Sequence, residues 1–381
     1  MPGCYTELDL SPNPLEIARQ ARAAGDGYID LTSSNPTQQG LLFPPAILRA
    51  AAEGYWDTRR YAPDPRGSLP ARAAIAAYYA GRTPTLALPE DDIFITASTS
   101  EAYGLLFALL ADPGDNLLAP AVTYPLFEYL AALRGIELRP YELIEPEGWR
   151  IDGESLLAAA NRRTRGVLII SPHNPTGAVV GTPVAALRQL GLPVICDEVF
   201  APFHYAAPAA PPLATLHPEL PVFTLNGISK LFALPDMKLG WVALSQAATS
   251  YGGRLELLND TFLGANSLTQ HMLPRIFAEG TPFVDAMAAR VRLNLDYALA
   301  ALEGHPRLHA NAPDGGYYLF PSVDGWEYEE ALALHLLDSG VLAHPGFYYG
   351  EVPGSHLMIS AITRSDDFRE GINRLIAALE G

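Results

Sequence analysis

Residues 222–244 read VFTLNGISKLFALPDMKLGWVAL, in which a mixed segment separates two apolar runs. The outer runs, 222–225 and 240–244, have the length and composition of buried strands. The segment between them contains Lys230 and Lys238, the only two lysines in a chain with 23 arginines. Because a lysine can lose its proton and form an imine, which an arginine cannot do, the retained lysines indicate covalent or proton-transfer chemistry.

Further short apolar runs alternate with stretches of helical period on both sides of this segment. Strands are expected at 92–96, 116–119, 167–170 and 193–196, and helices at 101–111, 125–133 and 184–190. This alternation predicts an α/β domain with a mainly parallel sheet.

The C-terminal part of the chain has a different pattern. Runs at 316–320, 341–343 and 356–362 are expected to be strands among helices such as 368–379. We therefore predict a large domain at 46–280 and a smaller α+β domain made from 1–45 and 281–381.

Length and composition exclude several classes of protein. The chain has 381 residues, 49% of them hydrophobic and 18% charged, so it is neither a disordered tail nor a small disulfide scaffold. Its formal net charge of −17 argues against nucleic acid as a partner.

Cellular location is predicted from the N-terminus, the cysteines and the apolar runs. The residues MPGCYTELDL lack the basic start and apolar run of a signal peptide, and Cys4 and Cys196 are too few for a disulfide framework. The longest apolar run, 105–111, is far shorter than the roughly 18 residues that span a bilayer. We expect a cytoplasmic protein without a membrane partner.

Polar residues that follow predicted strands are candidate ligand contacts, since ligands bind beyond the carboxyl ends of strands in open parallel sheets. Ser98, Thr99 and Ser100 follow the first strand and precede a helix, where free backbone amides and hydroxyls can hold a phosphate. A plain helix cap is the alternative interpretation of these three residues.

Two more strand ends carry polar side chains. The rigid segment SPHNPTG, 171–177, follows a strand and aims the amide of Asn174. Asp197, in the motif CDEVF, stands at the end of the strand predicted at 193–196. A buried carboxylate there requires a cationic or hydrogen-bonding partner. Cys196 should point to the opposite face of the sheet, as a buried core thiol.

SPHNPTG, CDEVF and SKLFALPDMKLGW, in this order, resemble the class I/II aminotransferases among the fold-type I pyridoxal-phosphate enzymes. The segments YAPDPRG, TASTSEAYGLLFALLADPGD, PAVTYPLF, GGYYLFP and HPGFYYG extend the resemblance over most of the chain. It implies a mainly parallel seven-stranded sheet between helices, plus a smaller α+β domain. It also implies pyridoxal 5'-phosphate as the cofactor.

The resemblance assigns roles residue by residue. Lys230 would form the internal aldimine and move protons, Asp197 would pair with the pyridine nitrogen, and Asn174 would bond the phenolic oxygen. Tyr124 would stack on the ring, and Tyr61 would reach the phosphate from the neighbouring subunit of a homodimer. The phosphate contacts would come from Ser98, Thr99, Ser100, Ser229 and Lys238.

Three positions depart from the family pattern. Phe200 replaces a common Tyr that donates to the phenolic oxygen, and Lys238 replaces a common Arg. Met358 stands where an Arg commonly holds the substrate carboxylate. Arg364 is roughly 20 Å further along an extended strand, too far to be a simple replacement. His356 is on the same strand face and is therefore a candidate, with a structural histidine as the alternative interpretation. Otherwise the carboxylate is held by another group or is absent.

The predicted reaction is transfer of an amino group between a small amino acid or amine and a 2-oxo acid. The alternative, motivated by Met358 and Phe200, is a lyase, decarboxylase or cyclase with the same cofactor. No metal site is expected: His305 and His309 have helical spacing, but Pro306 lies between them.

Overall fold

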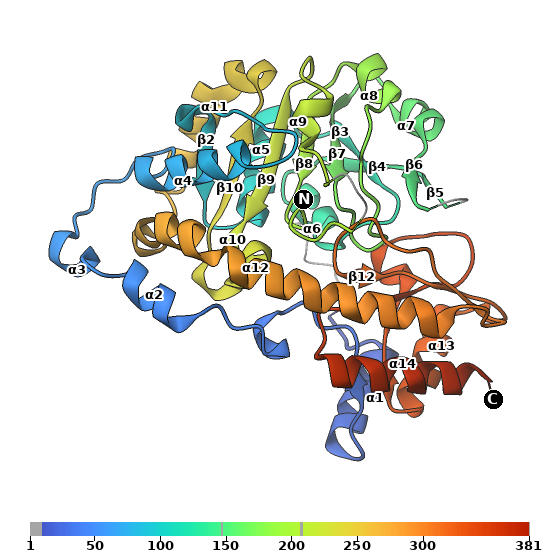
Figure 1. Cartoon of the computed structure of the whole chain (residues 1–381). Helices are drawn as coiled ribbons and strands as arrows, with labels where there is room; N and C mark the ends of the chain where they lie inside the picture. Colours follow the sequence, from blue (N-terminus) through green and yellow to red (C-terminus); the bar gives the residue numbers. More distant parts are fainter. Residues whose placement is uncertain (1–9, 146–147, 206–208, 381) are drawn as a thin grey trace.

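The structure, a computed structural model, describes residues 10–145, 148–205 and 209–380. Its centre is a seven-stranded sheet with the strand order β2-β10-β9-β8-β7-β3-β4, in which β10 runs antiparallel to the other six strands (Figure 1). The strands are β2 (Ile93–Thr96), β3 (Asn116–Pro120), β4 (Glu137–Tyr141), β7 (Thr164–Ile170), β8 (Val194–Asp197), β9 (Val222–Gly227) and β10 (Gly240–Leu244).

Six of these strands lie where the sequence predicts them, with ends that differ by up to three residues. The seventh, β4, was not predicted. It pairs with β3 at the edge of the sheet, and Arg139 and Pro140 interrupt its apolar pattern. An edge strand tolerates Pro because one side of its backbone pairs with no neighbour.

Both faces of the sheet are covered by helices. On one face, α5 (Thr99–Leu110), α6 (Leu126–Ala132) and α11 (Gly252–Asp260) pack on a core that includes Ile195 and Leu225. The other face carries Cys196, fully buried in a core with residues of α7 (Gly153–Ala159), α8 (Ala185–Leu190) and α9 (Leu213–Leu216). The prediction for Cys196 is confirmed, whereas Cys4 lies outside the described residues.

The longest helix, α12 (Ser267–Leu302), connects the sheet with the smaller part of the molecule. It packs against α4 (Leu69–Ala80), α2 (Pro45–Ala51) and α14 (Ser365–Glu380), and Figure 1 shows it as the orange helix below the sheet. The predicted domain division stays a prediction, and its boundary at residue 280 falls inside this continuous helix.

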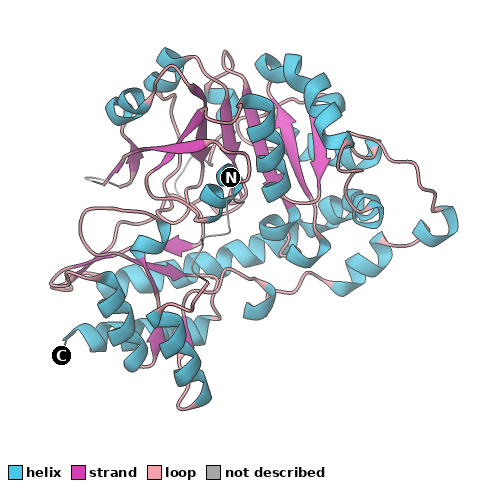
Figure 2. Ribbon diagram, turned by 180° about the vertical axis from the view of Figure 1, so that it is seen from behind, coloured by secondary structure: helices cyan, strands magenta, loops and turns pink. Residues whose placement is uncertain are grey.

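The smaller part combines both ends of the chain (Figure 2). β1 (Ile29–Asp30) pairs in parallel with β14 (Val341–Leu342), so the N-terminal segment joins the C-terminal elements. A three-stranded sheet has the order β12-β16-β15, with β12 (Tyr318–Leu319), β15 (His344–Pro345) and β16 (Leu357–Ser360). Two more helices pack on each other here, α1 (Pro14–Ala24) and α13 (Glu329–Asp338).

The remaining elements are short. They are the helices α3 (Tyr55–Thr58) and α10 (Ile228–Leu231), the strands β5 (Leu143–Ile144), β6 (Arg150–Ile151), β11 (Leu308–His309) and β13 (Ser322–Val323), and the 3-10 turns η1 (Thr37–Gln39), η2 (Glu90–Asp92), η3 (Pro235–Met237), η4 (Gln246–Tyr251) and η5 (Gly346–Tyr349).

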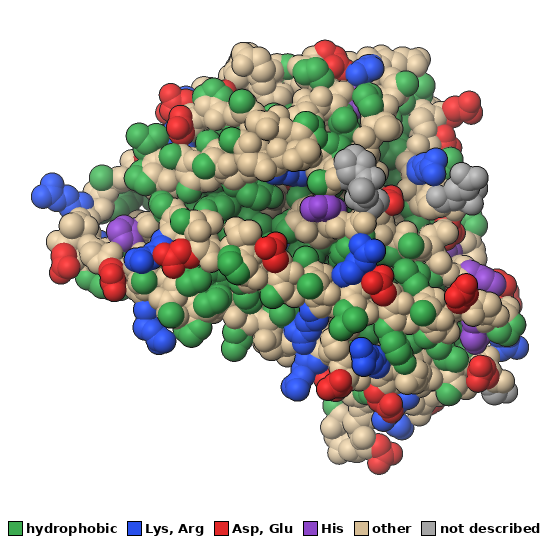
Figure 3. Space-filling model, in the orientation of Figure 1, with side chains coloured by type: hydrophobic (Ala, Val, Ile, Leu, Met, Phe, Trp, Pro, Cys, Tyr) green, Lys and Arg blue, Asp and Glu red, His purple; other side chains and the backbone are tan. Residues whose placement is uncertain are grey.

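Within the described part of the chain, no helix has both the length and the apolar composition needed to cross a bilayer. On the face drawn in Figure 3, Lys and Arg side chains are interspersed with Asp and Glu.

Candidate active site

A cavity of about 270 Å³ opens at the carboxyl ends of the parallel strands. It is lined by residues that follow β2, β7, β8 and β9, together with side chains from the smaller part of the molecule. Nine of the ten predicted cofactor-binding residues line it: Ser98, Thr99, Ser100, Tyr124, Asn174, Asp197, Ser229, Lys230 and Lys238.

Strand register explains why residues far apart in sequence meet here. Ile170, Asp197 and Leu225 are neighbours across β7, β8 and β9. Gly240 of β10 pairs with Gly227 on one side and with Thr96 on the other. The loops after these strands therefore begin at one edge of the sheet.

Lys230 lies on the short helix α10, directly after β9. Its Nζ donates a hydrogen bond of 2.9 Å to the carbonyl oxygen of Ser34, and it lies 5.8 Å from the centre of the Tyr317 ring. Burial lowers the pKa of Lys230 to about 8, while Tyr124 and Asp197 act in the opposite direction. A neutral amine is therefore accessible near physiological pH, as a lysine nucleophile requires.

Asp197 is the acidic side chain of the cavity, and it is buried. Its Oδ1 accepts the Val199 N–H at 3.0 Å, and its Oδ2 accepts the Tyr103 hydroxyl at 2.8 Å. Burial raises the pKa of Asp197 to about 6, although both hydrogen bonds and Lys230 lower it. The expectation that this carboxylate has a hydrogen-bonding partner is confirmed.

The turn before α5 forms a polar cradle. Ser98 caps the helix, since its hydroxyl accepts the Glu101 N–H and its carbonyl accepts the Ala102 N–H. The first-turn amides of Thr99 and Ser100 have no acceptor one helical turn before them.

Strand β10 lies tightly against this turn. A Cβ on Gly240 would lie 2.8 Å from the Ser98 carbonyl carbon and from the Thr99 nitrogen. Lys238, two residues earlier, has a left-handed backbone with φ of 46°. The close approach brings a lysine, two hydroxyls and unpaired amides to one end of the cavity, which suits a phosphate group.

The side chain of Asn174 has a buried polar atom that a ligand in the cavity could bind. The side chain is buried, and its Oδ1 has no hydrogen-bond partner among the described residues. A buried amide without a partner is costly, so a polar ligand atom in the cavity would satisfy it. The carboxamide can present either its oxygen or its NH₂ group by rotation.

Tyr124 lies at the opening of the cavity, with 45% of its surface exposed. Its ring contacts Phe127 edge to face at 5.9 Å. An aromatic side chain in this place is free to cover one face of a planar ligand.

Phe200 lines the cavity. It stands at the position where the family that the sequence resembles commonly has a tyrosine. Its ring packs against Tyr317 at 4.8 Å and against Tyr318 at 5.7 Å. Tyr318 also lines the cavity, so its phenol lies beside Phe200, which has no hydroxyl of its own.

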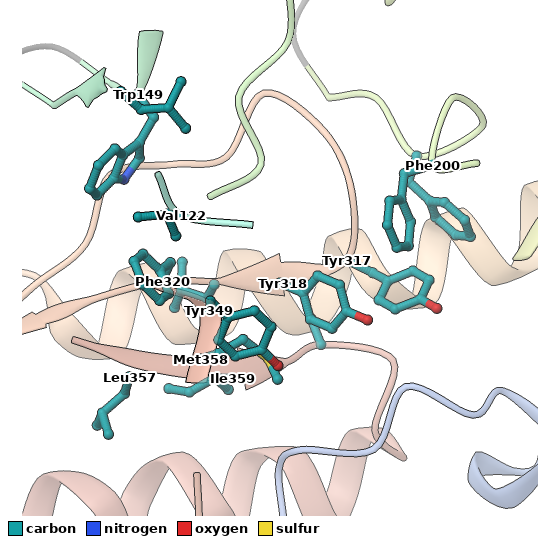
Figure 4. Close-up of a cluster of buried hydrophobic side chains, with 14 of the residues drawn as sticks. Val122, Trp149, Phe200, Tyr317, Tyr318, Phe320, Tyr349, Leu357, Met358 and Ile359 are labelled. Atoms are coloured by element: carbon teal, nitrogen blue, oxygen red, sulfur yellow. The ribbon is translucent and has the colours of Figure 1, made fainter. Parts of the chain in front are cut away.

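Met358 is buried on β16, among the aromatic and aliphatic side chains of Figure 4. It pairs with His344 of β15, and its neighbour Ile359 pairs with Leu319 of β12. His356 stacks on Phe320 with ring centres 5.0 Å apart.

None of Met358, His356 and Arg364 lines the cavity. Among the described residues that do, the only lysine or arginine side chains are Lys230 and Lys238. The described part of the cavity therefore offers no arginine to hold a substrate carboxylate.

Tyr61 is the one predicted cofactor-binding residue that does not line the cavity of its own chain. It follows α3, at the outer edge of the molecule in Figure 1, and 83% of its surface is exposed.

Three polar side chains of the cavity were not singled out from the sequence: those of Ser34, Tyr103 and Tyr318. Tyr103 lies one helical turn after the Ser98–Ser100 cradle, a spacing that could have indicated it. Ser34 and Tyr318 come from the smaller part of the molecule, and no local pattern places them next to Lys230.

Comparison with known proteins gives a consistent result along the chain. The family described as aminotransferase class I and II matches residues 26–375. Human tyrosine aminotransferase is 28% identical over 392 residues, covering 95% of this chain and 83% of that protein. Glutamate-pyruvate aminotransferase AlaA of Escherichia coli K12 is 28% identical over 399 residues, covering 99% and 96%.

Solved structures agree with this result. An aminotransferase from Escherichia coli superposes with a TM-score of 0.87 at 26% identity, covering 99% of this chain and 97% of that one. An alanine aminotransferase from Pyrococcus furiosus, at 24% identity and a TM-score of 0.86, shares the fold over 95% of both chains.

Proposed function

Because the chain belongs to the aminotransferase class I and II family, whose members depend on pyridoxal phosphate, we propose that Lys230 is the residue that binds this cofactor covalently. The substrates would be a small amino acid or amine and a 2-oxo acid. The observation that carries the proposal is the presence of Lys230, Asp197 and the Ser98–Ser100 cradle in one cavity of about 270 Å³.

The phosphate end of the cofactor fits the cradle before α5. Thr99 and Ser100 would offer backbone amides, Ser98 and Ser229 would offer hydroxyls, and Lys238 would supply the positive charge. A lysine can serve in place of an arginine because phosphate needs a positive charge more than a planar fork.

The ring end fits between the polar groups of β7 and β8. Asp197 would stand opposite the ring nitrogen and Asn174 would donate to the phenolic oxygen, while Tyr124 would cover one face. Tyr318 would take the place of the hydroxyl that Phe200 lacks. When bound, the cofactor supplies an aldehyde that captures amino groups and a protonated ring that accepts electrons from the substrate.

Lys230 performs the proton transfers of the reaction. Its neutral Nζ would remove the proton from the α-carbon of the substrate and later return one, as a general base and then a general acid. The Ser34 carbonyl, 2.9 Å away in the structure, keeps this amine at the cavity wall.

The second subunit is part of the proposal. Tyr61 and Trp56 expose 83% and 67% of their surfaces on the segment around α3. Large exposed aromatic side chains favour an interface. We propose a homodimer in which Tyr61 reaches the phosphate of the partner site. The low cysteine content favours a cytoplasmic location.

Absorbance spectroscopy and single-turnover mixing test the function. The reconstituted protein should be yellow, and an effective amino donor should convert the bound cofactor to pyridoxamine phosphate, with one keto product per site. Lys230→Ala and Lys230→Arg should both lose the yellow colour, because neither side chain can form an imine at neutral pH. Carbon dioxide or an elimination product without pyridoxamine phosphate would instead support a decarboxylase or lyase.

A further inference from the structure

Tyr103 makes a contact with Asp197 that the proposed function leaves unexplained. The Tyr103 hydroxyl donates to Asp197 Oδ2 at 2.8 Å, and both side chains are buried, with 2% and 6% of their surfaces exposed. Asp197 Oδ1 accepts the Val199 N–H at 3.0 Å. Each carboxylate oxygen therefore holds one donor from the chain and keeps a lone pair for a ligand.

The position of the Tyr103 ring is fixed by its neighbours. Tyr103 lies on α5, and its ring packs against Phe127 at 4.6 Å and Phe107 at 5.9 Å. α5 covers the same face of the sheet toward which Asp197 points, because Ile195, two residues before Asp197, belongs to the core under α5. The hydroxyl is thus held beside the carboxylate by rigid packing.

Tyr103 can act only as a donor in this pair. Burial and the charge of Asp197 raise the pKa of the phenol well above its ordinary value, so it stays protonated. A carboxylate that accepts a hydrogen bond from a neutral phenol is stabilised in its charged form.

The other charged groups near Asp197 do not replace this contact. Glu198, the next residue, forms a buried ion pair with Arg82. Lys230 favours the charged carboxylate, but it bonds the Ser34 carbonyl. Among the described side chains, only that of Tyr103 forms a hydrogen bond with Asp197.

We propose that Tyr103 is a positioning residue that orients Asp197 and weakens it as a proton acceptor, so that the proton shared with the cofactor remains on the ring nitrogen. The inference rests on the proposed function, in which Asp197 faces that nitrogen. Without the Tyr103 hydrogen bond, the buried carboxylate competes better for the proton, and the ring becomes a poorer electron acceptor.

Tyr103→Phe tests the proposal, since it removes the hydroxyl and keeps the ring. We expect the affinity for pyridoxal phosphate, titrated into the apoprotein, to fall about tenfold, as for one hydrogen bond to a charged group. The ¹⁵N signal of ring-labelled cofactor should move from the protonated toward the neutral pyridine position.

Tyr141→Phe is the matched control. Tyr141 is also a fully buried tyrosine, and its hydroxyl donates to the Leu168 carbonyl at 2.9 Å rather than to Asp197. This variant should keep the wild-type cofactor affinity and ¹⁵N signal. An equal change in both variants would overturn the proposal, because it would show that the loss of any buried tyrosine hydroxyl alters the cofactor affinity and the ¹⁵N signal.

A double-mutant cycle with Asp197→Asn separates the inference from the proposed function. If Tyr103 acts through Asp197, Tyr103→Phe should have no further effect on affinity or on the ¹⁵N signal in the Asp197→Asn background. A tenfold effect that persists there would refute the role of Tyr103. If Asp197→Asn alone leaves the ring nitrogen protonated, the proposed role of Asp197 fails instead.

Discussion

The carbonyl oxygen of Ser34 accepts a hydrogen bond from Lys230 Nζ at 2.9 Å, across 196 positions of sequence. Ser34 belongs to the N-terminal segment, whose strand β1 pairs with β14 of the C-terminal part. The preceding residue, Ser33, accepts the Ser360 hydroxyl at 2.6 Å through its carbonyl. The position of the reactive amine therefore depends on contacts between both ends of the chain and the central sheet.

Lys230→Met should stabilise the apoprotein at pH 7 by about 1–2 kcal/mol. Burial lowers the pKa of Lys230 to about 8, so below this pH the folded chain holds a charge that is better solvated when unfolded. Between pH 8 and the ordinary lysine pKa, the wild type regains this stability and the variant does not. Urea unfolding of both apoproteins at pH 7 and pH 10 should show the difference shrinking; a constant difference would contradict the assignment.

Gly240→Ala should destabilise the protein by about 1–3 kcal/mol and weaken cofactor binding, because its Cβ would lie 2.8 Å from the Ser98–Thr99 peptide. Gly104→Ala, on α5 itself, is the control. Its Cβ meets nothing within 4 Å, so it should stabilise the helix by up to about 1 kcal/mol. Thermal unfolding and cofactor titration measure both effects, and equal behaviour of the two variants would count against the cradle.

Arg82→Met should cost about 3–5 kcal/mol, since it leaves Glu198 buried without its partner. Glu198 also accepts the Leu213 N–H at 3.0 Å, so the pair fixes the loop after β8. The control is Arg188→Met, which breaks an exposed ion pair with Glu219 and should cost less than about 1 kcal/mol. Denaturant midpoints compare the two, and similar losses would show that burial is not the cause.

Tyr318→Phe should raise the pKa of the yellow chromophore by about one unit, since one hydrogen bond to the charged phenolic oxygen is lost. Tyr141→Phe is the control, because its hydroxyl donates to the Leu168 carbonyl at 2.9 Å and Tyr141 does not line the cavity. Absorbance titration of both holoenzymes measures the shift. An unchanged chromophore in Tyr318→Phe would mean that no tyrosine replaces the hydroxyl missing at Phe200.

The central sheet could be predicted because most of its strands are short, uninterrupted apolar runs. β8 and β9 are buried along their whole length. β4 was not predicted because it is an edge strand, partly exposed, and because Arg139 and Pro140 interrupt its apolar pattern. α12 contains Pro274 and Pro282, which normally end helices, so local sequence does not indicate 36 continuous residues; packing on α4, α2 and α14 stabilises it.

Nine cavity residues could be predicted because each is tied to a strand end or to a family motif. Tyr103 was not assigned a role, although it lies one helical turn after the cradle, because a tyrosine within the apolar helix α5 has the pattern of a core residue. Ser34 and Tyr318 reach the cavity only through the tertiary fold. Tyr61 stays a prediction, since its proposed site is on a second subunit.

The cavity should bind amino donors with and without a carboxylate group about equally well. Its only described lysine or arginine side chains are Lys230, which would act as a neutral base, and Lys238, which would hold the cofactor phosphate. L-Alaninamide, the neutral analogue of L-alanine, should therefore react within about tenfold of the amino acid, whereas loss of a charged clamp worth about 1.5–3 kcal/mol would cost more.

Single-turnover rates at saturating and limiting concentrations of both compounds separate binding from chemistry. The α-proton of the amide is more acidic than that of the amino acid, which by itself changes the maximal rate. The two compounds are therefore compared by their half-saturating concentrations. A loss of binding greater than about 100-fold for the amide would contradict the prediction. It would require a cation from outside the described cavity, and the partner subunit would then have to provide it.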